Sequence, residues 1–173
     1  MSRANHVRAI ADLAESEGVF TTAQAERSGI PRDALHDAVV SGRLDRVLRG
    51  AYRLVGSGAS PLDELIAVWK LTAPSRFTYE RMRPSEWDGI AVGGTTAAYI
   101  HGMGDFHLSP FRLYVPSRIT TRRRAVEFVE RRIARDEVVF SKGVPVTRPE
   151  RTLQDLVTDR EDLSLVERAA QQW

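Results

Sequence analysis

The hydrophobic and polar positions of residues 18 to 41 follow two short helical patterns separated by a turn. Thr21 and Gln24 have the spacing of a capping box, which predicts the start of a helix. Gly29 predicts the end of that helix, because glycine tolerates the left-handed conformation past a helix C-terminus. Pro31 suits the first position of a second helix, which Gly42 ends. The inward stripe of this second helix comprises Leu35, Ala38 and Val39. Its outward face comprises Arg32, Asp33, His36, Asp37 and Val40.

The pattern changes to that of a hairpin over residues 43 to 54. Arg49-Gly50 supplies a turn between two short runs of apolar residues, which predicts paired strands. The apolar strand positions are Leu44, Val47, Tyr52 and Leu54. An earlier amphipathic helix is predicted from Val7, Ile10, Ala11, Leu13 and Ala14, and it would back the two short helices.

Helix, turn, helix and hairpin, in that order, are the outline of a winged helix-turn-helix, a scaffold that commonly binds DNA. The hairpin is basic, because it holds four arginines and one aspartate. Use of this scaffold for protein contacts alone remains an alternative, since a fold does not fix a function. The candidate DNA-binding residues are Thr21, Thr22, Arg32, Asp33, His36, Arg43, Arg46, Arg49 and Arg53.

A stretch rich in glycine and serine, residues 56 to 61, follows the hairpin and predicts a domain boundary. We expect a winged helix-turn-helix over residues 1–56 and a second domain over residues 60–173. Ser60 and Pro61 predict the start of a helix, whereas residues 74 to 89 have an irregular, polar pattern. Further helices are predicted at 95–102, from 149 and from 163, and strands at 111–115, 126–130, 138–140 and 144–147. The predicted fold class is α+β, with a small mixed α/β domain after the winged helix.

Composition narrows the class of protein. The chain has 173 residues, of which 42% are hydrophobic, and it has no cysteine, so we expect neither a disulfide framework nor a thiolate zinc site. No apolar run is long enough to span a membrane, and the N-terminus has the pattern of an amphipathic helix that carries acids rather than of a signal peptide. We therefore expect a cytoplasmic protein with no membrane partner.

Charge is informative through its distribution, because the net charge is only +2. Residues 112 to 135 hold eight arginines and two glutamates. The densest run, Arg122, Arg123 and Arg124, is a candidate partner-binding segment that could meet an acidic protein face or a nucleic acid. The alternative is a solvated loop between two strands.

No pattern predicts an enzyme. His101, Asp105 and His107 could be imagined as a metal or catalytic cluster, but they flank glycines in a predicted loop and nothing fixes their geometry. The sequence has neither a nucleophile elbow nor a phosphate-binding loop. We therefore expect no catalytic residues, no metal and no cofactor.

Four segments resemble the AbiEi-type antitoxins of type IV toxin–antitoxin systems. They read GVFTTAQA, SGIPRDALHDAVVSGRL and LRGAYRL in the first 54 residues and GVPVTRPERTLQDLV at residues 143 to 157. The resemblance implies a DNA-binding antitoxin that represses its own operon by binding double-stranded DNA of its own promoter region. It also implies that the protein opposes a cognate nucleotidyltransferase-like toxin, with or without direct contact.

The same resemblance implies that the second domain is similar to nucleotidyltransferases. Gly93-Gly94 would be the turn of that family, but Arg112 and Tyr114 stand on the next strand where metal-holding acids would be needed. We therefore expect a catalytically empty version, although an ordinary helix-entry turn would leave the same glycines. Two rival functions remain open: a winged-helix transcriptional regulator without a toxin, and the N-terminal part of a longer protein with a nuclease domain. The chain stops at Trp173, inside a predicted helix, so an antitoxin domain that is incomplete at its C-terminus remains an alternative to a natural end.

Overall fold

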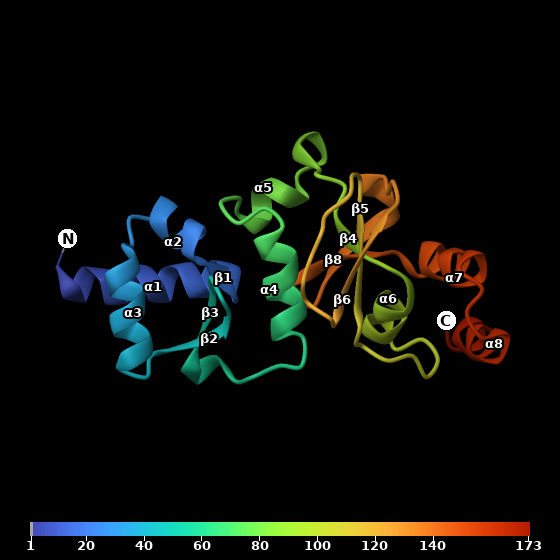
Figure 1. Cartoon of the computed structure of the whole chain (residues 1–173), viewed down its shortest axis with the longest axis horizontal. Helices are drawn as coiled ribbons and strands as arrows, with labels where there is room; N and C mark the ends of the chain where they lie inside the picture. The colour runs from blue at the N-terminus through green and yellow to red at the C-terminus, as the bar shows by residue number, and fades with distance from the viewer. Residues whose placement is uncertain (1) are drawn as a thin grey trace. The chain divides into compact units, whose positions relative to one another are not determined.

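A computed structural model describes residues 2–173, which form two compact units that meet in the chain between Arg81 and Met82 (Figure 1). The fold is mixed, with helices and sheet in both units, as the sequence predicts. The helices of the first unit are α1 (Arg3–Glu17), α2 (Thr22–Arg27), α3 (Arg32–Val40), α4 (Asp63–Leu71) and all but the last residue of α5 (Thr78–Met82). Its strands are β1 (Phe20–Thr21), β2 (Leu44–Leu48) and β3 (Ala51–Leu54), and they form an antiparallel sheet in the order β1-β3-β2.

The capping box at the start of α2 is present as the sequence predicts. The Thr21 hydroxyl accepts from the Gln24 backbone N–H at 3.0 Å, and the Gln24 side chain accepts from the Thr21 N–H at 2.9 Å. Gly29 follows α2 with a φ of +78°. Pro31 precedes α3 as its N-cap residue, one position earlier than predicted. Between them, Ile30 is fully buried and fixes the turn between the two helices in the core.

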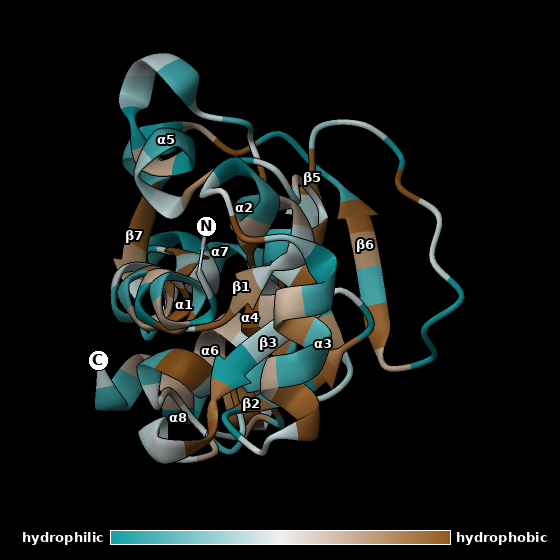
Figure 2. Cartoon of the chain, turned by 90° about the vertical axis from the view of Figure 1, so that its left-hand side faces the viewer, coloured by the Kyte–Doolittle hydropathy of each residue, from teal (hydrophilic) through white to brown (hydrophobic). Residues whose placement is uncertain are grey.

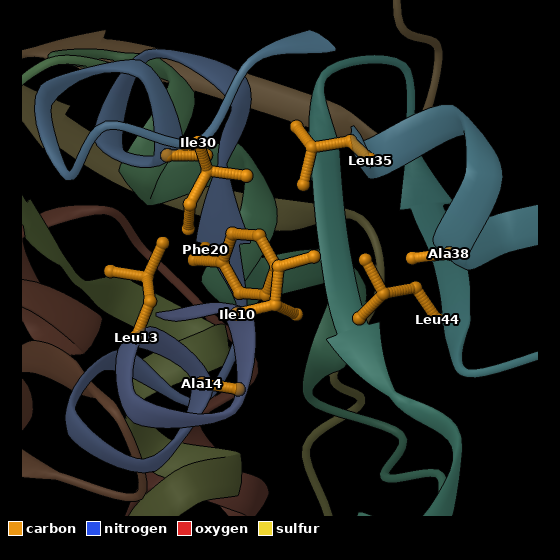
Figure 3. Packing of buried hydrophobic residues seen from close by; sticks show 9 residues of the cluster. Ile10, Leu13, Ala14, Phe20, Ile30, Leu35, Ala38 and Leu44 are labelled. Carbon is orange, nitrogen blue, oxygen red and sulfur yellow. The ribbon is translucent and has the colours of Figure 1, made fainter. Parts of the chain in front are cut away.

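The core of the first unit lies between α1, the two short helices and the sheet (Figure 3). Figure 3 shows side chains from α1, β1, α3 and β2 converging around Phe20, which is fully buried. Burial of side chains of this size from every element of the helix–turn–helix and the hairpin is the main stabilising contribution. The cluster consists of Ile10, Leu13, Ala14, Phe20, Ala25, Ile30, Leu35, Ala38 and Leu44.

The first unit extends past the predicted boundary at residues 56–60. Ala67 of α4 packs with Val19 and Ala51, so α4 covers the sheet of the first unit. Lys70 of α4 forms a buried ion pair with Glu17 of α1, with 2.8 Å between Nζ and Oε2. The glycine- and serine-rich stretch is therefore a connection within the unit, and residues 60–81, which we assigned to the second domain, pack with the first unit.

The second unit is a five-stranded mixed sheet with helices packed on it. The strands are β4 (Ala91–Val92), β5 (Phe111–Val115), β6 (Val126–Glu130), β7 (Val138–Ser141) and β8 (Val144–Thr147), in the order β6-β5-β4-β8-β7. The β4–β8 and β5–β6 pairs are parallel, and the other two pairs are antiparallel. Helices α6 (Gly94–His101), α7 (Pro149–Thr158) and α8 (Leu163–Gln172) lie together beside the sheet (Figure 1).

Candidate nucleic-acid interface

The first unit has a concave surface between α2, the start of α3 and the β2–β3 hairpin. We call this cavity, which has a volume of about 470 Å³, the wing cavity. It brings together Thr21, Thr22, Arg32, Arg46 and Arg49 of the predicted DNA-binding residues. Its other lining residues are Ala23, Glu26, Leu35, Gly50, Tyr52, Leu71 and Pro74.

The two cavity threonines have different roles. Thr21 is 1% exposed, and its hydroxyl both caps α2 and donates to the Pro74 carbonyl oxygen at 2.5 Å. Its polar atoms are therefore committed to the fold, and the assignment of Thr21 as a DNA contact is corrected to that of a capping residue. Thr22 is half-buried, and its backbone N–H donates to the Gly50 carbonyl at 3.0 Å, which holds the start of α2 against the hairpin turn.

The hairpin presents two of its arginines to solvent and keeps the other two within the fold. Arg46 and Arg49 are exposed, and no ion pair is recorded for either among residues 2–173. The side chain of Arg53 is only 14% exposed, and it donates to Asp45 at 2.6 Å and lies 3.4 Å from Asp63. Arg53 is therefore corrected to a residue that joins the hairpin to α4. Arg43 is half-buried and lines a different, largely apolar cavity beside α1.

The outward face of α3 is exposed as the sequence predicts. Asp33, His36, Asp37 and Val40 are all exposed, and Val40 is 73% exposed. Arg32 stands at the start of the helix, where its Nε lies 2.8 Å from an oxygen of Glu26 on α2. This exposed pair links the two helices across the mouth of the wing cavity. A phosphate group that approached would compete with Glu26 for the Arg32 guanidinium.

Polar side chains link α1, α2, α4 and α5 of the first unit, some of them buried and some exposed. The Glu17 carboxylate accepts from Lys70, from the Gln24 amide at 3.0 Å and from the Thr78 hydroxyl at 2.7 Å. Burial lowers the pKa of Lys70 despite its pairing with Glu17. Arg27 of α2 makes two hydrogen bonds with Glu80 of α5, at 2.8 and 2.9 Å. No sequence pattern indicated the links to Lys70, Thr78 and Glu80, because their partners lie about 50 residues or more away in the chain.

In the second unit, the double glycine adjoins the side chains of Tyr114 and Arg112 on β5. A Cβ on Gly93 would lie 2.0 Å from the Tyr114 ring, and a Cβ on Gly94 would lie 2.7 Å from the Arg112 side chain. The glycines thus allow β5 side chains to cross the start of α6. This contact explains Gly93-Gly94 without a bound phosphate.

Arginines and acids surround Tyr114 in a closed network. Arg131 lies 4.7 Å over the Tyr114 ring, donates to its hydroxyl at 3.0 Å and binds Asp155 and Asp159. Arg112 pairs with Glu127, Asp159 and Glu161 at 3.2 to 3.5 Å. Burial raises the pKa of Tyr114, and the hydrogen bond with Asp159 raises that of Arg131. Both guanidinium groups are thus paired with carboxylates of the second unit.

The remaining candidate residues of the second unit are not brought together. His101 Nε2 lies 2.7 Å from the Thr147 carbonyl oxygen, Asp105 pairs with Arg168 at 2.7 Å and His107 is exposed. Within residues 2–173, no group of three histidines or acids is placed to hold a metal ion. The described helices also include none long and apolar enough to cross a membrane.

Comparison with known protein families finds a match to part of the first unit. Residues 8–55 match the family described as "Transcriptional regulator, AbiEi antitoxin", which confirms the resemblance for that segment. This family implies a DNA-binding regulator of the antitoxin class. No curated protein matches the chain.

The fold is similar to that of a solved structure. The crystal structure of the RV2827C protein from Mycobacterium tuberculosis matches with a TM-score of 0.53 and 17% sequence identity. The match covers 90% of this chain and 60% of that one, so this chain spans less than two thirds of its solved relative. At this identity the likeness concerns the fold alone.

Proposed function

Since residues 8–55 carry an AbiEi-type segment, we propose that the first unit binds DNA as a winged helix-turn-helix. The observation that carries the proposal is the wing cavity, where residues from α2, α3 and the hairpin form one surface. It includes Arg46 and Arg49, which are exposed and have no ion pair among residues 2–173. In this scaffold the second helix enters the major groove and the wing contacts the backbone or the minor groove. We assign α3 and the β2–β3 hairpin to these roles.

The contacts divide by chemistry. Arg46 and Arg49 have no carboxylate partner among the described residues and suit phosphate oxygens, which position the protein without reading sequence. Arg32 and His36 can donate to base edges, and Asp33 can accept from a cytosine amino group. Thr22 adds a hydroxyl at the start of α2. We omit Thr21 and Arg53 because their polar groups are used within the fold.

The resemblance supports the finer proposal that the protein represses its own operon and opposes a nucleotidyltransferase-like toxin. The second unit would then be a catalytically empty relative of nucleotidyltransferases. The position of Arg112 and Tyr114 supports the absence of catalysis in this proposal. They stand on the strand beside Gly93-Gly94, where a Mg²⁺ site would need carboxylates. A regulator without a toxin is the second candidate, because the family match covers only residues 8–55.

Binding of the full-length protein to a duplex from its own upstream region tests the DNA-binding proposal. We expect an affinity that falls with salt, because phosphate contacts release counterions. Arg46→Ala with Arg49→Ala should weaken binding to all duplexes alike. Arg32→Ala or His36→Ala should instead alter sequence preference, by about 1–3 kcal/mol for each lost base contact.

Arg53→Ala serves as the matched control, because it removes a hairpin arginine that is turned into the fold. Its DNA affinity should follow its folded fraction alone. Absence of retention at low salt by the intact, folded protein would overturn the DNA-binding proposal. Growth rescue of cells that express the neighbouring gene separates the two candidates, since a regulator without a toxin gives no rescue.

A further inference from the structure

The connection between β5 and β6, residues 116–125, is an exposed basic segment that we call the basic crossover. Because β5 and β6 are parallel, their connection must return along the length of a strand. Here it does so without a helix. Figure 2 shows it standing out beyond β6, the edge strand of the sheet.

The crossover carries four arginines and no acid. Arg118, Arg122, Arg123 and Arg124 are all exposed, and no ion pair is recorded for any of them among residues 2–173. The one hydrogen bond recorded within the segment joins the Arg123 backbone N–H to the Thr121 hydroxyl at 3.1 Å. The sheet arginines of the same unit, Arg112 and Arg131, are by contrast matched with carboxylates. Arg132 and Arg160 of this unit are also exposed and without an ion pair among the described residues, but the crossover gathers four such arginines within residues 118–124.

The chemistry of the crossover favours a nucleic acid over a protein partner. Stable protein interfaces are built around buried apolar or aromatic anchors. The segment has no exposed large hydrophobic residue, and its one large apolar side chain, Ile119, is half-buried. Surfaces that bind nucleic acids are polar and positively charged, and arginine matches phosphate oxygens with two donors. Ser117, Thr120 and Thr121 add hydroxyl groups that can also donate to phosphate.

We propose that the basic crossover binds the phosphodiester backbone of nucleic acid, independently of base sequence. This surface belongs to the second unit and is separate from the wing cavity. It can add affinity to sequence recognition by the first unit, or hold RNA, since both polymers present the same phosphate chemistry. The proposal does not depend on which DNA sequence the winged helix recognises.

The test measures salt-dependent binding of the full-length protein to two probes of random sequence, a DNA duplex and a single-stranded RNA. For the variant Arg122→Ala with Arg124→Ala, we expect the slope of log K against log salt to fall by about 0.9 per lost phosphate contact on duplex DNA, and by about 0.7 on RNA. Loss on only one probe identifies which polymer the crossover binds. A variant in which lysine replaces both arginines should keep most of the slope, because it keeps the charge.

Arg132→Ala with Arg160→Asn is the matched control, since it removes two other exposed arginines of the second unit. Asparagine suits position 160, where φ is +57°. We expect this control to bind both probes as the wild type does. Equal slopes for the crossover variant, the control and the wild type would overturn the proposal. Unchanged binding to both probes together with lost growth rescue would assign the crossover to a protein partner instead.

Discussion

The hairpin of the first unit and the sheet of the second unit both carry arginines, but the hairpin leaves two of its arginines without an ion pair among residues 2–173, whereas Arg112 and Arg131 of the second unit are both paired. Arg46 and Arg49 project from the hairpin into solvent. Arg112 and Arg131 lie across the sheet and meet acids from β6, from α7 and from the chain after α7. The density of arginine along a chain therefore does not tell whether a surface is available to a polyanion. What decides it is whether the fold brings carboxylates to the guanidinium groups.

The largest effect should come from truncation of the first unit. A chain of residues 1–56 lacks α4 and α5, so it loses Lys70 as the partner of Glu17 and uncovers the apolar face around Ala51. We expect no cooperative thermal transition for residues 1–56 and a cooperative one for residues 1–81, measured by far-UV circular dichroism. A transition of residues 1–56 at the same temperature as that of residues 1–81 would show that α4 and α5 are dispensable.

A methyl group at the double glycine should disturb the second unit. Gly93→Ala would place a Cβ against the Tyr114 ring, whose position is fixed by Arg131, and should cost about 3 kcal/mol of unfolding free energy. Gly56→Ala, in the first unit, meets no atom within 4 Å and should change stability by less than about 0.5 kcal/mol. Urea unfolding of both variants measures the difference, and a neutral Gly93→Ala would contradict the close packing of Tyr114.

The contrast between the arginines is tested by the same substitution in both units. Arg131→Met leaves Asp155, whose side chain is 5% exposed, with one arginine fewer, so we expect a loss of about 2 kcal/mol. Arg46→Met should leave stability unchanged within about 0.5 kcal/mol while it weakens DNA binding. Urea unfolding gives the stability of each variant, and a DNA titration gives its affinity for DNA. Equal stability losses would remove the distinction between the two regions.

The smallest effect concerns the stability of the first unit in acid. The hydrogen bonds from Arg27 lower the pKa of Glu80 to about 2, from an ordinary value of 4.5. Because the pKa is lower in the folded state, the stabilisation is complete above about pH 4.5 and is lost as the pH falls towards 2. Glu80→Gln should flatten the stability curve in this window, measured by urea unfolding of residues 1–81 at several pH values. An unchanged curve would show that the pair with Arg27 does not contribute.

Sequence patterns predicted the elements that depend on local chemistry. The capping box at Thr21, the turn at Gly29 and the apolar strand at Phe111–Val115 need only neighbouring residues, and each is present. The two-residue strands β1 and β4 and the short helix α5 escaped prediction, because segments of that length have no readable period. The domain boundary predicted at residues 56–60 differed from the observed one for another reason. Glycine and serine indicate a turn, but they do not tell which neighbour an amphipathic helix will pack on.

The candidate site was predictable only in part. The exposed face of α3 and the hairpin tip followed from spacing. Spacing did not predict whether a given arginine forms an ion pair. Pairing depends on acids that are distant in sequence, such as Asp63 for Arg53 and Glu80 for Arg27. Thr21 shows a second reason why the site was hard to predict. A threonine hydroxyl can cap a helix or donate to a phosphate, and the sequence does not tell which.

The contact between α2 and residues 74–76 has a consequence for how the chain can vary. Thr21, Arg27 and Gln24 donate to the backbone carbonyls of Pro74, Ser75 and Arg76 in turn. Main-chain acceptors persist whatever side chain they bear, so amino-acid replacements at 74–76 leave these bonds intact. Insertion or deletion of one residue there would move all three acceptors at once. Related sequences should therefore vary in amino-acid type at residues 74–76 but keep the length of this segment unchanged.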